Sequence, residues 1–244
     1  MPSLLHRPTF RRGLREALPF ILMVAPFGLL FGVVAQEAGL DLYQTMAMTI
    51  LVIAGSSQFA AAQMIADNAP ALIVLATALA VNLRMAMYSA SLTPHLGQAP
   101  TWQRALVAYL LIDQAYALAS VEYDKRPAAS LPDKLAYFFG TMTVIAPVWY
   151  GATWLGATVG AAIPPWLALD FAVPITFLAM VAPMLRTLPH LAAATMSVVA
   201  SLALAWMPHN TGLLAASALA MMAGAQAELW LSRHKLRRGP EEAR

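Results

Sequence analysis

The stretch 54-AGSSQFAAAQ-63 interrupts an apolar run that extends from residue 43 to residue 66. A membrane-spanning helix does not need four consecutive small or polar residues at its centre, so GSSQ calls for another explanation. If the helix is continuous, the serine hydroxyls bond back to carbonyls of their own turn. If the helix breaks at Gly55, then Ser56 or Ser57 caps a new half-helix, and the positive end of that half-helix faces an anionic group of a ligand.

The composition indicates the class of protein. Of the 244 residues, 60% are hydrophobic and 11% are charged, whereas a soluble domain has roughly 45–50% apolar and about 25% charged residues. Long apolar runs recur, each near the ~20 residues that cross a bilayer as a helix. We therefore predict an all-α integral membrane protein. The chain has no cysteine, which excludes disulfides, thiolate metal sites and cysteine nucleophiles.

Apolar runs and the Pro- or Gly-containing turns between them predict eight transmembrane helices, some of them broken at the midplane. They form a transmembrane domain over 18–231, between a cytoplasmic N-terminal segment, 1–17, and a basic tail, 232–244. The first run is too long for a signal peptide, whose apolar core has about 7–15 residues. The predicted spans are 18–38, 43–66, 70–92, 105–122, 135–155, 166–186, 190–207 and 212–231.

The basic residues predict the orientation, because short cytoplasmic loops are enriched in Lys and Arg. Eight spans place both termini and the 123–134 loop on one side, with 13 of the 15 basic residues; Arg104 falls on the other side and Arg84 within a span. We therefore predict cytoplasmic termini. The basic tail is interpreted as an orientation signal and a contact with the lipid bilayer. No folded soluble domain carries it, so it does not indicate nucleic-acid binding.

A faint internal repeat is also visible. A shift of 121 residues places Ala25-Pro26 on Ala146-Pro147, and Gly39 on Gly160. With four spans in each half, such a shift predicts a parallel repeat, an arrangement that occurs in transporters.

Helix breakers and polar groups collect near the centres of the predicted spans. Proline removes a backbone donor, and non-helical backbone in a bilayer has to be buried in protein or line a water-filled cavity. A charge at a helix centre costs roughly 2.5–3.5 kcal/mol on insertion scales. Transporters place their binding sites at this depth, on broken helices. The central residues are Pro26, Gly28, Gly55, Asn82, Asp113, Pro147 and Pro174.

Some of the singled-out residues also have a structural interpretation. Gly28 and Gly32 form a GxxxG pattern that lets helices pack closely, and Gly156 and Gly160 form a second one. Asp170, about one turn inside the edge of its span, is either a helix-start acid or a residue at the mouth of a pathway.

Four central polar residues leave a similar choice. Arg84 and Asp113 fall within about 4 Å of the same depth at a rise of ~1.5 Å per residue. They form either a structural ion pair that holds two spans in register or part of a binding site. Asn82 and Gln58 are either hydrogen-bonding groups between helices or ligands of a substrate.

An enzyme or a metal site is not indicated. No histidine is central to a predicted span, so Ser56 and Ser57 lack the adjacent base that a nucleophilic serine needs. His or acidic pairs at metal-ligand spacing do not recur within a span. We expect neither a metal nor a cofactor.

Four segments, in order and spread over nearly the whole chain, resemble the AzlC family of branched-chain amino acid permeases. They are 19-PFILMVAPFGLLFG-32, 54-AGSSQF-59, 82-NLRMAMYSASL-92 and 169-LDFAVPITFLAMVAP-183. The resemblance implies an exporter of branched-chain and similar apolar amino acids in the bacterial inner membrane. It also implies pairing with a small AzlD-type membrane subunit.

Two positions depart from the family pattern. Met85 follows Asn-Leu-Arg, where the family often has histidine, and Gln114 follows Asp113, where it often has glutamate. Both changes remove titratable groups, which are the usual proton carriers. The sequence therefore names neither the coupling ion nor the particular amino acid.

The expected function is outward transport of a zwitterionic amino acid by a secondary transporter; the alternatives are a non-transporting scaffold subunit and a channel. We assign the substrate carboxylate to residues 55–58, the ammonium to Asp113 or to carbonyls freed near Pro26, and the aliphatic side chain to Phe27, Phe59 and neighbouring Met or Leu residues. Arg84 is either a second carboxylate ligand or the partner that keeps Asp113 charged. The predicted substrate-binding residues are Pro26, Phe27, Gly28, Gly55, Ser56, Ser57, Gln58, Phe59, Asn82, Arg84, Asp113 and Asp170.

Overall fold

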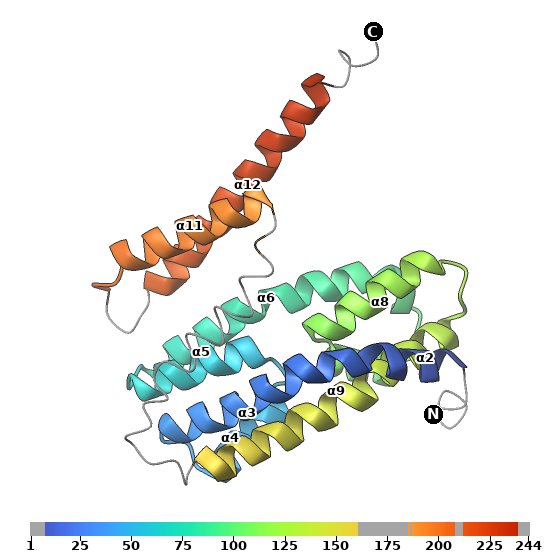
Figure 1. Ribbon diagram of the computed structural model, residues 1–244, viewed down its shortest axis with the longest axis horizontal. Coiled ribbons are helices and arrows are strands. Elements are labelled where there is room, and N and C mark those ends of the chain that lie inside the picture. Colours follow the sequence, from blue (N-terminus) through green and yellow to red (C-terminus); the bar gives the residue numbers. More distant parts are fainter. Residues whose placement is uncertain (1–7, 161–184, 186, 208–211, 239–244) are drawn as a thin grey trace. The chain divides into compact units, whose positions relative to one another are not determined.

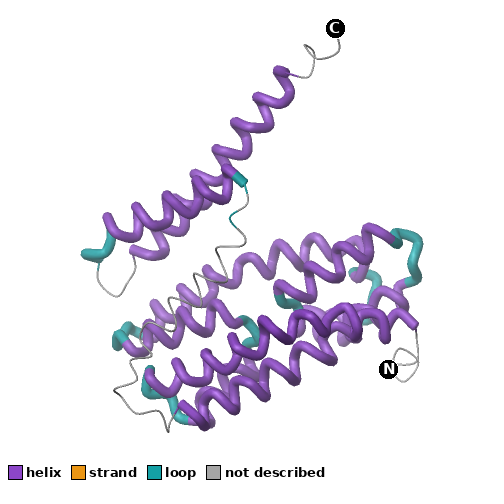
Figure 2. The backbone as a smooth tube through the Cα atoms, viewed as in Figure 1, coloured by secondary structure: helices purple, strands orange, loops and turns teal. Residues whose placement is uncertain are grey.

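The computed structural model describes residues 8–160, 185, 187–207 and 212–238, and the described residues form helices joined by short connections (Figures 1 and 2). This confirms the all-α prediction for that part of the chain. The chain divides into two compact units, Met1–Ala66 with Val74–Leu167, and Asp67–Ile73 with Ala168–Arg244. The sixth predicted span, 166–186, lies almost entirely outside the described residues, as does Asp170.

Two long helical elements form the centre of the first unit. One is a rod of three consecutive helices, α2 (Pro8–Ala17), the short 3-10 helix η1 (Leu18–Phe20) and α3 (Ile21–Glu37); the other is α9 (Leu131–Gly160). The backbone tightens into the 3-10 turn at Pro19, which has no N–H to donate. Helix α3 continues through Pro26, and α9 continues through Pro147. These two prolines therefore do not interrupt their helices, contrary to the expectation that breaks would gather there.

Glycines bring the rod and α9 into backbone contact. A Cβ added at Gly13 would overlap the carbonyl of Tyr137, and one added at Gly140 would overlap the carbonyl of Phe10. Because early residues of the rod face early residues of α9, the two run parallel (Figure 1). The N-terminal segment thus includes a helix, α2, that is packed along α9.

The same contact continues along α3. A Cβ at Gly32 would overlap the carbonyl of Thr153, a Cβ at Gly156 would overlap that of Leu29, and Gly28 faces Ala152. The close-packing interpretation of the first GxxxG pattern is therefore confirmed, and Gly156 supplies the opposing surface. Small residues are what helices in a bilayer need to approach this closely.

The predicted second span is a helical hairpin made of α4 (Leu42–Leu51) and α5 (Gly55–Ala66). The chain leaves α3 through Gly39, in the left-handed region at φ 82°, where a residue without Cβ is favoured. A capping box between Asp41 and Gln44 starts α4. Helix α5 then runs beside α3 toward the end of that helix, with the ring of Phe59 4.7 Å from that of Phe27 and 5.5 Å from that of Phe31. Both arms of this hairpin therefore lie at the end of the unit where α3 ends.

Helix α6 (Ala71–Leu96) follows, and a second hairpin made of α7 (Thr101–Leu110) and α8 (Asp113–Lys125) lies along its C-terminal half. Helix α8 runs parallel to that half: the hydroxyl of Tyr88 bonds to Asp113 over 2.8 Å, and the ring of His95 lies 5.2 Å from that of Tyr123. Helix α7 runs the opposite way, because Leu96 faces the same small cavity as Arg104, near the start of α7. The second hairpin therefore enters from the end at which α9 begins.

The prediction that 43–66 and 105–122 each cross the membrane is wrong for this fold. The two hairpins enter the first unit from opposite ends and meet near its middle, which reverses the predicted direction of α6. Three described helices are long and apolar enough to cross a membrane: Pro8–Glu37, Ala71–Leu96 and Leu131–Val159. The correction also moves Arg104 to the end that holds Arg12, Lys125 and the other basic residues of this unit, hereafter the basic end.

The second unit contains an antiparallel pair, α11 (Leu188–Ala203) and α12 (Gly212–Arg238). The side-chain oxygen of Thr187 accepts from the backbone N–H of His190 at the start of α11. Gly212 faces Leu204, and Gly224 faces Ala193, which gives the antiparallel direction. Helix α12 continues well into the basic segment that was predicted as a tail.

One buried hydrogen bond joins the first hairpin to α9 and gives a test of the fold. The indole Nε1 of Trp149 donates to the hydroxyl of Thr49 over 2.8 Å, and both residues are buried. In Thr49→Val the indole N–H stays buried without an acceptor, so we expect the free energy of unfolding to fall by about 1–3 kcal/mol. Unfolding in detergent micelles measures the change. Thr143→Val is the control, since the Thr143 hydroxyl is exposed and bonds only within α9; equal losses in both variants would contradict the prediction.

Candidate functional site

The candidate site lies where the two hairpin tips meet. In the first hairpin α4 ends at Leu51 and α5 begins at Gly55, so the chain is not helical over 52–54. In the second, α8 begins at Asp113, directly after a two-residue interruption. The hydroxyl of Tyr109, one residue before the end of α7, donates to the backbone carbonyl of Ile50 in α4. The predicted break at Gly55 is confirmed, and a second break that the sequence did not reveal lies opposite it.

Arg84, in the middle of α6, joins the two tips. One of its terminal nitrogens donates to the hydroxyl of Ser56 over 2.5 Å, and the other lies 3.0 Å from a carboxylate oxygen of Asp113. The ion pair between Arg84 and Asp113, one of the two interpretations that their common depth allowed, is therefore present. Their side chains are 30% and 40% exposed, so the pair is accessible from outside this unit rather than sealed in its core.

Tyr88 and Tyr116 extend the polar cluster toward the basic end. The Tyr88 hydroxyl donates to the second oxygen of Asp113, and its ring stacks on that of Tyr116 at 4.2 Å. Ser91 and Tyr116 share a hydrogen bond of 3.1 Å. Sequence reasoning missed both tyrosines. Their spacing was a usable signal, because Tyr88 lies one helical turn after Arg84, and Tyr116 three residues after Asp113.

The first turn of α5 differs from the predicted cap. Because α5 begins at Gly55, neither Ser56 nor Ser57 is its N-cap. The Ser57 hydroxyl bonds back to the carbonyl of Ala54 over 2.9 Å, which is the structural interpretation of this residue, whereas the Ser56 hydroxyl accepts from Arg84. Gln58 caps the turn weakly, since its side-chain oxygen lies 3.4 Å from the N–H of Ala54.

Three buried polar atoms of α5 and α6 have no hydrogen-bond partner among the described residues. They are the amide nitrogen of Gln58, the amide oxygen of Asn82 and the Nε of Arg84. The Gln58 side chain is 1% exposed. A buried donor or acceptor without a partner costs about 1–3 kcal/mol, so the atoms of Gln58 and Arg84, which lie at the first tip, indicate a place where a polar ligand or water completes the network.

An aromatic cluster closes the other side of the first tip. The rings of Phe27 and Phe59 lie 4.7 Å apart, and Trp149 stacks on Phe31 at 6.2 Å. A Cβ at Gly55 would come within 2.8 Å of Phe27 and 3.0 Å of Trp149. A larger residue at the start of α5 would therefore displace the rings of Phe27 and Trp149, so the first polar turn of α5 lies directly beside an apolar wall.

The structure brings together most of the predicted site residues. Gly55, Phe27 and Phe59 lie on the apolar side of the first tip, and Ser56, Arg84 and Asp113 form the polar bridge. Gly28 packs α3 against α9. Within the described residues, no group of three or more His, Cys, Asp or Glu side chains is placed to hold a metal ion.

Comparisons with known proteins relate the chain to membrane proteins. A family model described as AzlC protein matches residues 19–163, more than half of the chain. The inner membrane protein YgaZ of Escherichia coli (strain K12) is 28% identical over 115 residues, which cover 47% of each chain. An uncharacterized membrane protein of Archaeoglobus fulgidus is 26% identical over 76% of this chain and 80% of its own length. An uncharacterized membrane protein of Helicobacter pylori (strain 26695) is 23% identical over 62% of this chain. No solved structure matches the chain significantly.

Proposed function

Because the chain belongs to the AzlC family of membrane proteins, we propose that it is a secondary transporter that exports branched-chain or similar apolar amino acids across the inner membrane. The observation that carries the proposal is Arg84, which joins the polar first turn of α5 to Asp113 at the start of α8. A zwitterion needs one cationic and one anionic partner close together, and this pair supplies both. Transporters commonly bind substrates where helices are interrupted.

Each part of an apolar amino acid has a partner at the hairpin tips. The carboxylate binds Ser56 and the amide of Gln58, with Arg84 as its charged partner. The ammonium binds Asp113, which Tyr88 already holds in place. The side chain lies against Phe27 and Phe59. Substrate that inserts between Arg84 and Asp113 replaces their ion pair with two pairs of its own. Each of the two side-chain charges then still has a partner of opposite charge, which compensates for the water that it loses.

The arrangement also supports a membrane topology. The rod, α6 and α9 each cross the bilayer, and the two hairpins are re-entrant from opposite sides. Irregular backbone at such a depth is tolerated only when it is buried in protein or lines a water-filled cavity. In the first unit every described Lys and Arg except Arg84 lies at the basic end, which is therefore the cytoplasmic end by the distribution of positive charge. Asp41 lies at the opposite end of this unit.

Two assignments rest on the family resemblance. A small AzlD-type subunit is the proposed membrane partner. The alternatives to a carrier are a channel, which also uses interrupted helices, and a scaffold subunit that only supports a partner. A scaffold gains nothing from a charged pair between two hairpin tips, so the site geometry favours transport.

Flux measurements with purified protein test the proposal. We expect proteoliposomes to show saturable counterflow of labelled leucine, isoleucine or valine, and no counterflow of lysine. We also expect leucine at 100 times its dissociation constant to stabilise the protein by about 2.7 kcal/mol against unfolding. Flux that rises linearly with concentration would identify a channel. If no flux is found either with or without the small subunit, the protein is a scaffold subunit and the transporter proposal is wrong.

A further inference from the structure

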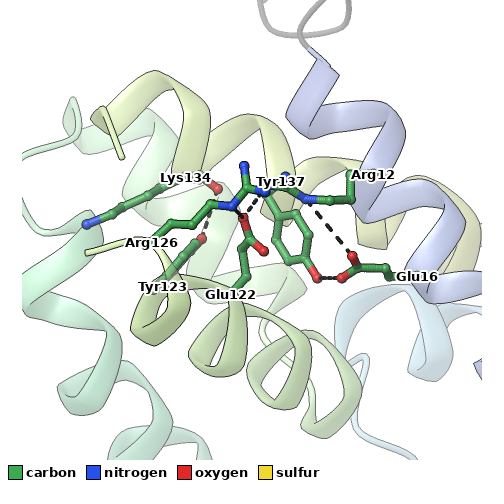
Figure 3. Close-up of polar contacts among 7 residues, drawn as sticks. All are labelled: Arg12, Glu16, Glu122, Tyr123, Arg126, Lys134 and Tyr137. Atoms are coloured by element: carbon green, nitrogen blue, oxygen red, sulfur yellow. Dashed lines mark hydrogen bonds and ion pairs between the residues drawn. The ribbon is translucent and has the colours of Figure 1, made fainter. Parts of the chain in front are cut away.

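Charged side chains of α2 and of the C-terminal end of α8 meet at the basic end of the first unit, beside Tyr137 of α9 and away from the hairpin tips (Figure 3). Arg12 of α2 donates to a carboxylate oxygen of Glu122 in α8, and the Nε of Arg126 lies 3.6 Å from the same oxygen. The Glu122 side chain is only 11% exposed. Two guanidinium groups thus share one buried carboxylate, and the Nε of Arg12 also lies 4.0 Å from a carboxylate oxygen of Glu16.

Hydrogen bonds hold the surrounding helices in place. The Tyr137 hydroxyl of α9 donates to Glu16 of α2, and the Tyr123 hydroxyl donates to the backbone carbonyl of Lys134 over 2.9 Å. The ammonium of Lys134 points away from Arg12 and Glu16 (Figure 3) and bonds to the carbonyl of Pro127. The geometry of this end is therefore set by contacts within the chain.

A cavity of about 460 Å³ opens beside this cluster. Its volume falls within the roughly 300–1,000 Å³ of small-molecule sites. Its charged lining residues are four basic and two acidic, so the walls carry a net positive charge. They are Arg12, Lys125, Arg126 and Lys134, with Glu122 and Asp133.

Two buried polar atoms of this lining have no hydrogen-bond partner among the described residues. They are the hydroxyl of Thr9 and the Nε of Arg12, which has an ion pair with Glu16 at 4.0 Å but no hydrogen bond. Buried polar groups are normally hydrogen-bonded, so the Thr9 hydroxyl, which has neither a hydrogen bond nor an ion pair among the described residues, indicates a missing partner in the wall of the cavity. Thr9 is the second residue of α2, where the end of the helix carries a positive partial charge. Both atoms can donate, so the missing partner is an acceptor.

We propose that this cavity binds a phosphate group, carried either by an anionic lipid headgroup or by free phosphate. Arginine matches phosphate geometry through paired N–H donors, and the Thr9 hydroxyl adds a neutral donor. Basic pockets between helices near the membrane surface bind anionic headgroups in other proteins. The site is separate from the amino-acid site, and it stands whether or not the chain exports amino acids.

Three single variants of the full-length protein test the site. Arg126→Gln removes a charged donor, and we expect it to weaken binding of phosphatidylglycerol roughly tenfold. Thr9→Val removes a hydroxyl that has no partner within the described chain, so we expect weaker binding without loss of folded protein. Arg15→Gln is the matched control, because Arg15 is an exposed residue of the same helix and does not line the cavity. We expect it to bind within twofold of the parent.

Native mass spectrometry of the purified protein measures lipid binding, with phosphatidylcholine as the neutral comparison. Thermal unfolding in inorganic phosphate, compared with chloride at equal ionic strength, measures free phosphate. Binding of phosphatidylglycerol alone identifies the headgroup as the source, and stabilisation by inorganic phosphate shows that the free ion suffices. The proposal is overturned if neither anion binds better than its comparison. It is also overturned if Arg126→Gln and Thr9→Val bind like Arg15→Gln.

Discussion

Replacing Gly156 by alanine is expected to lower the free energy of unfolding by about 3 kcal/mol or more, the upper end of what overpacking costs. The added methyl group would overlap the backbone carbonyl of Leu29. No rotamer change relieves this clash, because the atom that it meets belongs to the main chain of α3. Either α3 and α9 move apart along their whole contact, or the helices deform locally. We expect little monodisperse protein on size-exclusion chromatography and a clearly lower unfolding midpoint.

Gly151→Ala is the matched control for this prediction. Gly151 belongs to the same helix, and a Cβ there would meet nothing within 4 Å. Alanine also has the higher helix propensity, by about 1 kcal/mol, so the control is expected to be neutral or slightly stabilising. If Gly156→Ala unfolds at the same midpoint as Gly151→Ala, then α3 and α9 do not pack as closely as this fold requires.

The close packing was predictable because it depends on a short local pattern. Gly28 and Gly32 lie four residues apart on one face of a helix, and that spacing has few uses in a bilayer other than close approach. The break at Gly55 was predictable for a similar reason. Four small or polar residues in an apolar run conflict with a continuous spanning helix, and the structure shows the interruption three residues long.

The hairpins were not predictable from hydropathy. A run of ~20 apolar residues has the same composition whether the chain crosses the bilayer or turns back at its middle. The break before Asp113 also contains neither glycine nor proline, since residues 111–112 are Leu and Ile. Arg104 was the available signal. It was the one basic loop residue on the non-cytoplasmic side of the eight-span topology, and reversing the direction of α6 removes this exception.

The reversed direction of α6 also changes the kind of internal symmetry to expect. A long helix followed by a hairpin occurs twice in the first unit, as α3 with α4–α5 and as α6 with α7–α8, in opposite directions. Such an inverted arrangement brings two hairpin tips together from opposite sides. The predicted parallel repeat relates α3 to α9, and these helices do run parallel, but much of its second half lies outside the described residues. The symmetry that builds the site is therefore the inverted one.

Replacing Asp113 by asparagine is expected to reduce amino-acid export roughly 10- to 100-fold, as lost charge-assisted hydrogen bonds to a ligand do. Asparagine keeps the size of the side chain and an oxygen that accepts from the Tyr88 hydroxyl. What it loses is the charge that the substrate ammonium requires. Since the Asp113 side chain is 40% exposed, we expect nearly the parental amount of folded protein. Counterflow in proteoliposomes, normalised to folded protein, measures the effect.

Arg84→Met and the double variant Arg84→Met/Asp113→Asn separate a binding role from a structural one. If the pair only holds the hairpin tips to α6, then Arg84→Met lowers the amount of folded protein. The double variant then recovers folding and transport, because no unpaired charge remains. If Arg84 and Asp113 both bind substrate, the single and the double variant both fold, and neither of them transports. Each variant then lacks at least one charged partner that the zwitterion needs. We expect the second outcome, with Arg104→Gln as a charge-matched control that leaves export unchanged. Recovery of export by the double variant would therefore refute the binding site at the hairpin tips, while leaving the fold intact.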